Sequence, residues 1–106
     1  MVARGDIWLV NLNPCIGSEI KKSRPCVVVS PPEMHDHLRT VTVAPMTTAS
    51  REAPFRISLT HGGRKGLILL DQMRAVDKAR LAKRLGAVSV KTLASTLSTL
   101  QEVFAE

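Results

Sequence analysis

The fold is decided around residues 25–29, which read Pro25-Cys26-Val27-Val28-Val29. A continuous run rich in β-branched residues is typical of a strand that is covered on both faces rather than half exposed. We therefore expect this strand at the centre of the core. The apolar, β-rich stretch from Ile7 to Leu12 predicts another strand before it, which ends in a turn at Asn13-Pro14.

Two further patterns predict the rest of the sheet. Residues 40–44 alternate polar and apolar side chains, and Pro45 lacks the N–H that a ladder needs, so we expect a strand that ends or reaches a sheet edge there. Residues 55–60 alternate with a strict period of two, and the Gly-rich stretch at residues 61–66 has hairpin-turn chemistry. Residues 67–74 are expected to return as the partner strand.

The C-terminal third predicts a helix. A short helical turn at residues 78–80 and a short strand at residues 85–88 come first, and Ser89 is a good N-cap. Apolar residues then recur at spacings of 3, 4, 3 and 4, which makes one stripe on an amphipathic helix. These residues are Val90, Leu93, Leu97, Leu100 and Phe104.

Many short strands followed by one helix indicate a mainly β (α+β) fold, a small and strongly bent antiparallel sheet or barrel with a C-terminal helix. The chain has 106 residues, with no internal repeat and no linker, so we expect a single domain over residues 1–106. That length leaves no room for a separate cofactor-binding domain and excludes most enzymes that use large cofactors. We expect no cofactor.

Charge and cysteine content narrow the partners and the compartment. Fifteen Lys and Arg against nine Asp and Glu give a net charge of +6, which favours RNA, DNA or an acidic protein as partner. Much of the excess lies between Arg74 and Lys91, and a solvated basic face explains it equally well. Two cysteines are too few for a disulfide framework, and no stretch is as apolar as a membrane span, so we expect a cytoplasmic protein.

No strong local motif names a reaction, because the chain has no phosphate-binding Gly loop, nucleophile elbow or paired-cysteine zinc site. His35 and His37 flank Asp36, but without further ligands they make a weak metal site. What remains is a set of polar residues at the expected strand ends, where loops on a rigid sheet suit a binding site. They are Ser18, Glu19, Lys21, Lys22 and Arg24 before one strand, Thr47 and Thr48 after another, and Asp71 and Gln72 within a third.

Arg24 is the most constrained of these residues. Pro25 restricts the residue before it to an extended backbone, so the guanidinium is held at the start of a core strand. A fixed fork of donors is what a phosphate needs. The alternative is an ordinary surface cation at the start of a strand. Asp71 and Gln72, in turn, interrupt an apolar run and indicate either a function or a buried hydrogen-bonded network.

Several short stretches stand in a specific order and spacing along nearly the whole chain. They are Arg4-Gly5-Asp6-Ile7-Trp8, Asn13-Pro14 followed by Gly17-Ser18-Glu19, Arg24-Pro25-Cys26-Val27-Val28, Ala44-Pro45-Met46-Thr47, and Leu70-Asp71-Gln72-Met73-Arg74 before Val76-Asp77-Lys78. In these stretches the chain resembles the MazF/PemK family of toxin–antitoxin endoribonucleases. The resemblance implies a small SH3-like barrel with a C-terminal helix, of the kind shared by CcdB, MazF and PemK toxins.

The resemblance also implies a function. Members work as homodimers that cleave single-stranded RNA, often mRNA, at short sequences without a metal, and an antitoxin with a disordered, acidic tail covers the RNA groove. The implied catalytic pair is Arg24 and Thr47, and Ser18, Glu19, Asp71 and Gln72 match positions that line the groove. Attack of the ribose 2′-hydroxyl on phosphorus would leave a 2′,3′-cyclic phosphate and a 5′-hydroxyl end.

Within the family, the PemK branch has a His and an Arg where this chain has Ser18 and Leu69, which favours the MazF-type pair over a PemK-type set.

Two alternatives remain beside this interpretation. A non-catalytic poison of the CcdB type, which binds a protein target such as a gyrase, would use the same barrel and leave Arg24 and Thr47 dispensable. A basic RNA-binding module without chemistry is a further alternative, and the three aromatic residues of the chain count mildly against it.

Overall fold

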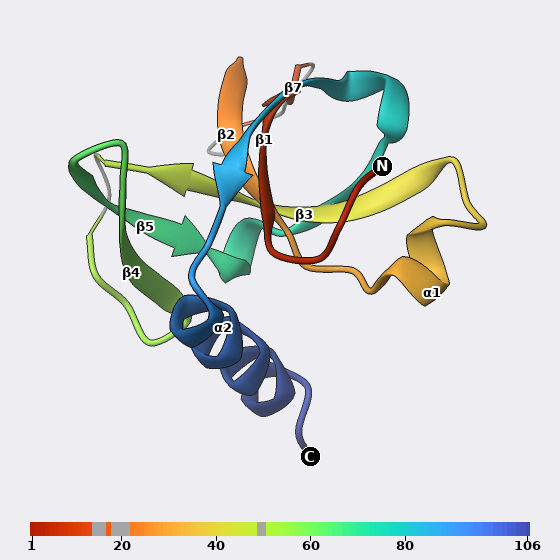
Figure 1. The fold of residues 1–106 in the computed structure, drawn as a ribbon. Helices are drawn as coiled ribbons and strands as arrows, with labels where there is room; N and C mark the ends of the chain where they lie inside the picture. The colour runs from red at the N-terminus through yellow and green to blue at the C-terminus, as the bar shows by residue number, and fades with distance from the viewer. Residues whose placement is uncertain (14–16, 18–21, 49–50) are drawn as a thin grey trace.

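In the computed structural model of the chain, the described residues are 1–13, 17, 22–48 and 51–106 (Figure 1). Within them, seven strands form one antiparallel sheet in the order β4-β5-β3-β2-β1-β7, with β6 paired to β3 outside that order. The strands are β1 (Asp6–Asn11), β2 (Ser23–Val28), β3 (Thr40–Thr47), β4 (Arg56–His61), β5 (Arg64–Leu69), β6 (Arg74–Asp77) and β7 (Leu81–Ala87). The helices are α1 (Pro32–His35) and α2 (Val90–Val103), and the 3₁₀ helices are η1 (Leu70–Gln72) and η2 (Lys78–Arg80).

Strand β2 lies in the middle of the sheet and separates two buried clusters. Val27 packs with Ile7 and Ile68 in one cluster, whereas Cys26 and Val28 belong to the other. Successive side chains of a strand point to opposite faces, so both faces of β2 are covered. The prediction from the β-branched run is confirmed.

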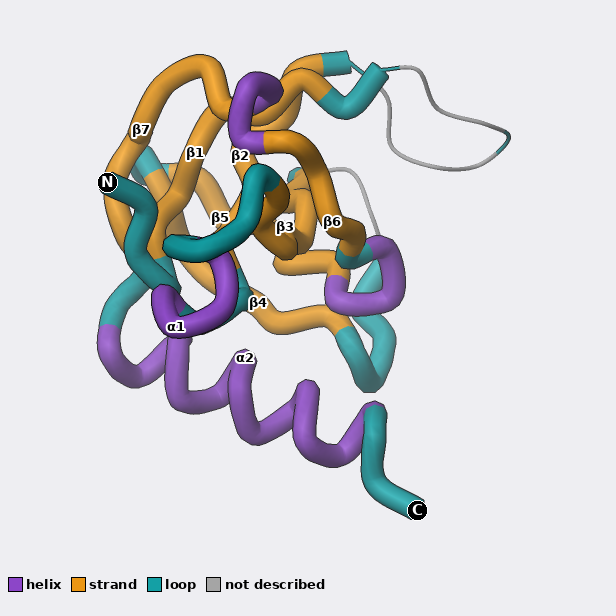
Figure 2. Tube along the Cα trace, turned by 90° about the vertical axis from the view of Figure 1, so that its right-hand side faces the viewer, coloured by secondary structure: helices purple, strands orange, loops and turns teal. Residues whose placement is uncertain are grey.

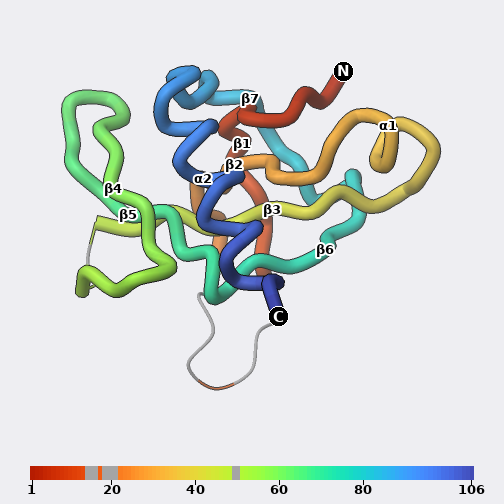
Figure 3. Tube along the Cα trace, turned by 90° about the horizontal axis from the view of Figure 1, so that it is seen from below, coloured from red at the N-terminus to blue at the C-terminus, as the bar shows by residue number. Residues whose placement is uncertain are grey.

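Strands β4 and β5 form the predicted hairpin, but β5 begins at Arg64 rather than at Leu67, so the turn is shorter than the expected stretch of residues 61–66. His61 pairs with Arg64, which leaves Gly62 and Gly63 as a two-residue turn. Both glycines have positive φ angles, 60° and 78°, as a type I′ turn requires. Figure 3 shows this hairpin and α1 at opposite ends of β3.

Strand β3 does not end at Pro45, so of the two predicted outcomes the ending is wrong, and Pro45 lies instead where one edge of β3 has no ladder partner. The strand continues to Thr47. The N–H of Val29 donates to the carbonyl of Thr42 across the neighbouring ladder, which makes Pro45, three residues further along, part of a non-hydrogen-bonded pair with Cys26. The nitrogen of Pro45 therefore faces away from β2, between the stretches of β3 that pair with β6 and with β5, where no ladder bond is lost.

The expected strand over residues 67–74 is also wrong beyond Leu69. Met46 pairs with Ile68 and Val43 pairs with Arg74, so residues 69–73 span only two positions of β3. The 3₁₀ helix η1 takes up the surplus length. Asp71 and Gln72, expected within a strand, therefore lie in η1.

Strand β7 curls the sheet. Its pairing with β1 shifts register twice, which leaves Leu85 and Ala82 as extra residues that bend the strand. At Gly86, where φ is +155°, an added Cβ would stand 3.7 Å from Cε1 of His61 on β4. Because β4 and β7 are the two ends of the strand order, this distance shows that the sheet curls and brings its ends close together at this point, as expected for a strongly bent sheet.

Helix α2 begins where the sequence predicts. Ser89 is the N-cap, and its Oγ accepts a hydrogen bond of 3.1 Å from the N–H of Thr92. The helix packs on β4 and runs along the base of the strands (Figure 2). In the part of the chain that the structure describes, no helix is long and apolar enough to cross a membrane.

The apolar stripe of α2 is confirmed only in its middle. Leu93 and Leu100 are half-buried, and Leu100 packs on the core cluster of Val27. The two ends of the stripe are exposed, since Val90 has 87% and Phe104 has 70% of its surface open to solvent. The periodicity marks the face correctly but does not show how far the underlying strands extend.

Candidate active site

Arg24 and Thr47 lie at neighbouring ends of β2 and β3. The two strands pair antiparallel as far as Cys26 and Pro45. Two more residues along the same register place Arg24 across from Thr47, and a step of two keeps both side chains on one face of the sheet. Pro25 holds Arg24 in the extended backbone of β2. The pairing of two core strands thus brings together two residues that are 23 positions apart.

A cavity of about 200 Å³ opens at this point, with walls from four strands and from the residue after β3. Its lining residues are Arg24, Pro25, Met46, Thr47, Thr48, Leu59, His61, Arg64 and Gly66. A second hollow of about 470 Å³ shares Thr47, Thr48, Leu59 and Gly66 with it and is completed by Glu52, Ser58, Thr60, Lys65 and Leu67.

The two volumes suit different groups. Sites that enclose drug-sized ligands measure about 300–1,000 Å³. The smaller cavity is below this range and suits one compact anionic group, with Arg24 and Arg64 as cations in its lining. The larger hollow falls within the range and suits a planar base. Because Thr47 borders both, a chain that lies across them would present a phosphate to Arg24 and a base to the second hollow.

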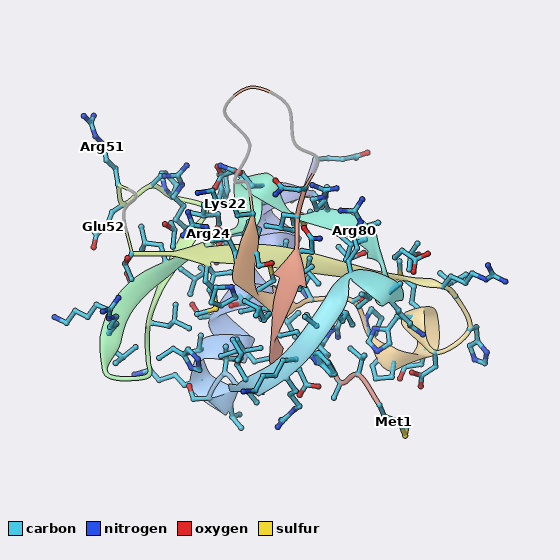
Figure 4. All side chains as sticks on the ribbon, turned by 90° about the horizontal axis from the view of Figure 1, so that it is seen from above. Met1, Lys22, Arg24, Arg51, Glu52 and Arg80 are labelled. Carbon is cyan, nitrogen blue, oxygen red and sulfur yellow. The ribbon has the colours of Figure 1, made fainter. Side chains whose placement is uncertain are left out.

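Positive charge surrounds the site. Figure 4 shows Lys22 and Arg24 along the same side of the molecule, with Arg80 further along that side and Met1 on the opposite side. Lys22 is exposed and takes a positive φ of 67° just before β2, where its N–H donates to Oδ1 of Asn13. Such a surface attracts a polyanion.

Part of the basic stretch from Arg74 to Lys91 has a structural role instead. Arg74 and Arg80 donate hydrogen bonds to backbone carbonyls of residues 11–13, at the end of β1. Arg84 forms an ion pair of 3.2 Å with Asp6. Burial raises the pKa of Asp6, but hydrogen bonds from the backbone and from Arg84 outweigh it, so the net pKa lies below its ordinary value. The alternative of a solvated face therefore holds for only some of these cations.

The other candidate residues differ in their placement. Thr48 lines both hollows, whereas Asp71 and Gln72 line neither. The carboxylate of Asp71 accepts two hydrogen bonds from Arg56, at 3.1 and 3.0 Å, and these lower its pKa. Ser18, Glu19 and Lys21 fall outside the described residues, so their assigned contacts remain predictions.

His61, Arg64 and Gly66 are the site residues that the sequence analysis missed. From the sequence, residues 61–66 were expected only to form a hairpin turn. Continuing the period-two pattern past Leu59 does place His61 on the core-facing side of β4, and that signal was available. What no local pattern shows is that the curl of the sheet carries this side to Arg24.

Cys26, next to this site, is a core residue rather than a nucleophile. It is fully buried, and burial raises the pKa of its thiol to about 12. The reactive form of a cysteine is the thiolate, which is absent at neutral pH with such a pKa.

Comparison with known proteins identifies the relatives of this chain. Residues 3–104 match the family described as PemK-like, MazF-like toxin of type II toxin-antitoxin systems. The chain is 36% identical to endoribonuclease PemK of Escherichia coli, over 94% of this chain and 80% of that protein. It is 34% identical to endoribonuclease toxin MazF of Escherichia coli K12, over 84% and 81% of the two chains. These two identities do not favour MazF over PemK.

Solved structures match the fold. MazF from Deinococcus radiodurans superposes with a TM-score of 0.84 at 26% identity, over 96% of this chain and 94% of that one. A mycobacterial endoribonuclease in complex with its cognate antitoxin has a TM-score of 0.80 at 20% identity, over 96% and 93%. The curled antiparallel sheet with a C-terminal helix is therefore confirmed as a MazF-like fold.

Proposed function

The chain belongs to the family of PemK-like, MazF-like toxins of type II toxin–antitoxin systems and is an endoribonuclease, and on that premise we propose that it cleaves single-stranded RNA at the cavity of Arg24 and Thr47. The observation that carries this proposal is that these two residues, from different strands, line one small cavity within a basic surface. The ribose 2′-hydroxyl attacks the adjacent phosphorus and the 5′-oxygen leaves. The products are a 2′,3′-cyclic phosphate and a 5′-hydroxyl end.

In this mechanism the two side chains stabilise the charge that builds on the phosphate. The guanidinium of Arg24 offers two parallel N–H donors to the non-bridging oxygens, and the hydroxyl of Thr47 adds a neutral hydrogen bond. Arg24 is a poor general base, because a guanidinium group carries donors only and has no site that accepts a proton. The chemistry uses the hydroxyl of the RNA itself as nucleophile, so we expect cleavage without a metal or cofactor.

The RNA would lie across the two hollows, with the scissile phosphate at Thr47. Thr48, shared by both hollows, and the exposed Lys22 would contact the strand on either side. Ser18, Glu19 and Lys21 are proposed to contact RNA from the β1–β2 connection. Asp71 and Gln72 are proposed as more distant contacts with the RNA. Asp71 would have to release its hydrogen bonds with Arg56 in order to contact RNA. Sequence specificity would come from these polar groups.

We propose the MazF-type pair as the catalytic centre. Ser18 and Leu69 replace the His and Arg of the PemK type, and Leu69 is a core residue only 1% exposed. It cannot be replaced by a charged group without burying that charge in the core. The proposal of a MazF-type pair is therefore supported by the chemistry of the residues that this chain has at positions 18 and 69.

The proposed partners follow from charge and exposed apolar surface. An antitoxin with an acidic, disordered tail would cover the cationic site, and its binding would weaken as salt screens the charges. A homodimer would cover apolar residues that one protomer leaves exposed, such as Val90, Phe104 and Phe55. The relative that is solved with its cognate antitoxin has the same fold.

Incubation with RNA tests the proposed function. Purified protein is incubated with a long unstructured RNA in EDTA, and both the cut positions and the chemistry of the new ends are mapped. We expect discrete cuts with 2′,3′-cyclic phosphate ends. Intact RNA, together with growth inhibition that persists after Arg24 and Thr47 are replaced, would instead indicate a poison that acts on a protein target.

Gly66 is expected to be essential for the position of Thr47. A Cβ at Gly66 would lie 3.1 Å from the carbonyl oxygen of Thr47, closer than side chains normally approach. Gly66→Ala therefore shifts the end of β3 by a few tenths of an ångström. We expect RNA cleavage to fall several-fold, which is less than the loss of about 10²-fold that a misplacement of about 1 Å can cause. Cleavage rates under single-turnover conditions measure the effect. His37→Ala, an exposed substitution beside α1, is the control for a change that leaves the β4–β5 hairpin intact.

A further inference from the structure

The cavity at Arg24 holds one side chain for which the proposed mechanism has no role, His61. It is the last residue of β4 and is followed by the Gly62-Gly63 turn. Because both glycines take the positive φ of a tight turn and His61 pairs with Arg64, its backbone position is well determined. His61 lines the same cavity as Arg24 and Thr47.

The imidazole also lies close to β7, at the other end of the strand order. Its Cε1 lies 3.7 Å from the place that a Cβ on Gly86 would take. Gly86 follows the bulge at Leu85, so at this position β7 faces the ring with backbone atoms and no side chain. The ring is half-buried between β7 and the cavity. A histidine that merely projected from a hairpin tip would not lie this close to a second strand.

The cleavage reaction needs a group that removes the proton of the 2′-hydroxyl. Among the described residues that line the cavity, Arg24 and Arg64 keep their charge and accept no proton, and the threonine hydroxyls are too weakly basic. Imidazole exchanges a proton between about pH 5 and 8. The cations can stabilise the phosphate and the departing oxygen, so proton removal is the role left for His61.

The elements packed around His61 carry mostly positive charge. Arg24 and Arg64 line the cavity itself, and Lys83 and Arg84 precede Gly86 on β7, where Arg84 is paired with Asp6. Helix α2, which packs on β4, carries Lys91 in its first turn and Glu102 in its last. Bound phosphate therefore meets a cationic site.

We propose that His61 is a catalytic residue of the cleavage reaction, the general base that takes the proton of the 2′-hydroxyl; this inference rests on the proposed function. The bond from the 2′-oxygen to phosphorus forms as the proton moves to the imidazole, and the bond from phosphorus to the 5′-oxygen breaks. The 5′-oxygen takes a proton from water. The imidazolium returns its proton to the hydroxide so formed, and the charges balance.

The test is single-turnover cleavage between pH 5 and 9 of a short single-stranded RNA that contains a site mapped with the unmodified protein. For that protein we expect the rate to rise with pH along one limb. His61→Ala and the size-conserving His61→Gln are expected to lose this limb and to cleave at least about 10²-fold more slowly. Their RNA affinity, measured by fluorescence anisotropy with a non-cleavable 2′-deoxy analogue, stays within about threefold. Added imidazole restores part of the rate of His61→Ala.

A second substrate separates a base from an acid. In RNA with a bridging 5′-sulfur at the scissile bond, the leaving group needs no proton, so a lost acid is rescued and a lost base is not. We expect both variants to stay slow on this substrate. Rescue by sulfur would overturn the assignment as base, and an unchanged rate or a loss confined to RNA affinity would overturn a catalytic role altogether. His37→Ala, an exposed histidine beside α1, is the matched control and should cleave normally.

Failure of this inference differs from failure of the proposed function. If His61 is not the base, the unmodified protein still cuts RNA and the variants follow its pH profile. If the chain is not an RNA-cleaving enzyme, the unmodified protein leaves the substrate intact at every pH.

Discussion

Replacing Arg24 by alanine is expected to slow RNA cleavage by about 10²–10³-fold, the loss seen when one preorganised donor to a developing negative charge is removed. The side chain is exposed at the start of β2 and lines the cavity, so its removal takes the donors from the phosphate and no packing from the core. Arg24→Lys keeps the charge but loses the planar fork, and we expect it to recover only a small part of the rate. The measurement is the single-turnover cleavage rate.

Arg39→Ala is the matched control for the loss of one positive charge. Arg39 is also exposed, but it precedes β3 at the end near α1, opposite the β4–β5 hairpin (Figure 3). We expect cleavage by this variant to remain within about threefold of normal, because a single exposed charge away from the site mainly changes association. Equal losses in the two variants would mean that Arg24 acts only through general charge. An active Arg24→Ala would remove it from the catalytic centre.

Replacing His35 by alanine is expected to lower the free energy of unfolding by about 2–4 kcal/mol, although the residue is far from the chemistry. His35 is fully buried, with Nδ1 at 2.8 Å from Oγ of Ser30 and Nε2 at 2.9 Å from the carbonyl oxygen of Val2. The carbonyl only accepts, so Nε2 donates to it. Alanine would leave a cavity, and the hydroxyl of Ser30 and the half-buried carbonyl of Val2 would each lose a hydrogen bond. Chemical denaturation followed by circular dichroism measures the change.

His37→Ala provides the comparison for His35. His37 is exposed two residues further on, and surface substitutions of this kind usually change stability by no more than about 0.5 kcal/mol. Two similar, small losses would show that the buried hydrogen bonds of His35 contribute little. The contacts of His35 with Ser30 and Val2 also explain this histidine without the weak metal site that the sequence left open.

Local patterns were sufficient for the parts of the fold that are made locally. The β-branched run at residues 26–28, the two glycines of the hairpin and the Ser89 cap each act through their own backbone preferences or their nearest neighbours, and each prediction is confirmed. At Pro45 the sequence left two outcomes open, the end of a strand or an edge, because the effect of a proline depends on which edge of β3 its nitrogen faces. Asp71 was expected in a strand, but the apolar run before it continues into a 3₁₀ turn.

The sequence by itself determined that the chain is mainly β with a capped C-terminal helix, and it singled out Arg24 and Thr47, which lie 23 positions apart. The antiparallel register of β2 and β3 then places these two residues at one cavity, because equal steps from a paired position keep residues opposite each other. Only the tertiary structure decided that His61 joins them. That placement depends on the bulges of β7 and the small size of Gly86, which let the ends of a curled sheet approach. The curvature of the sheet is the combined result of many strands, so no short stretch of sequence predicts it.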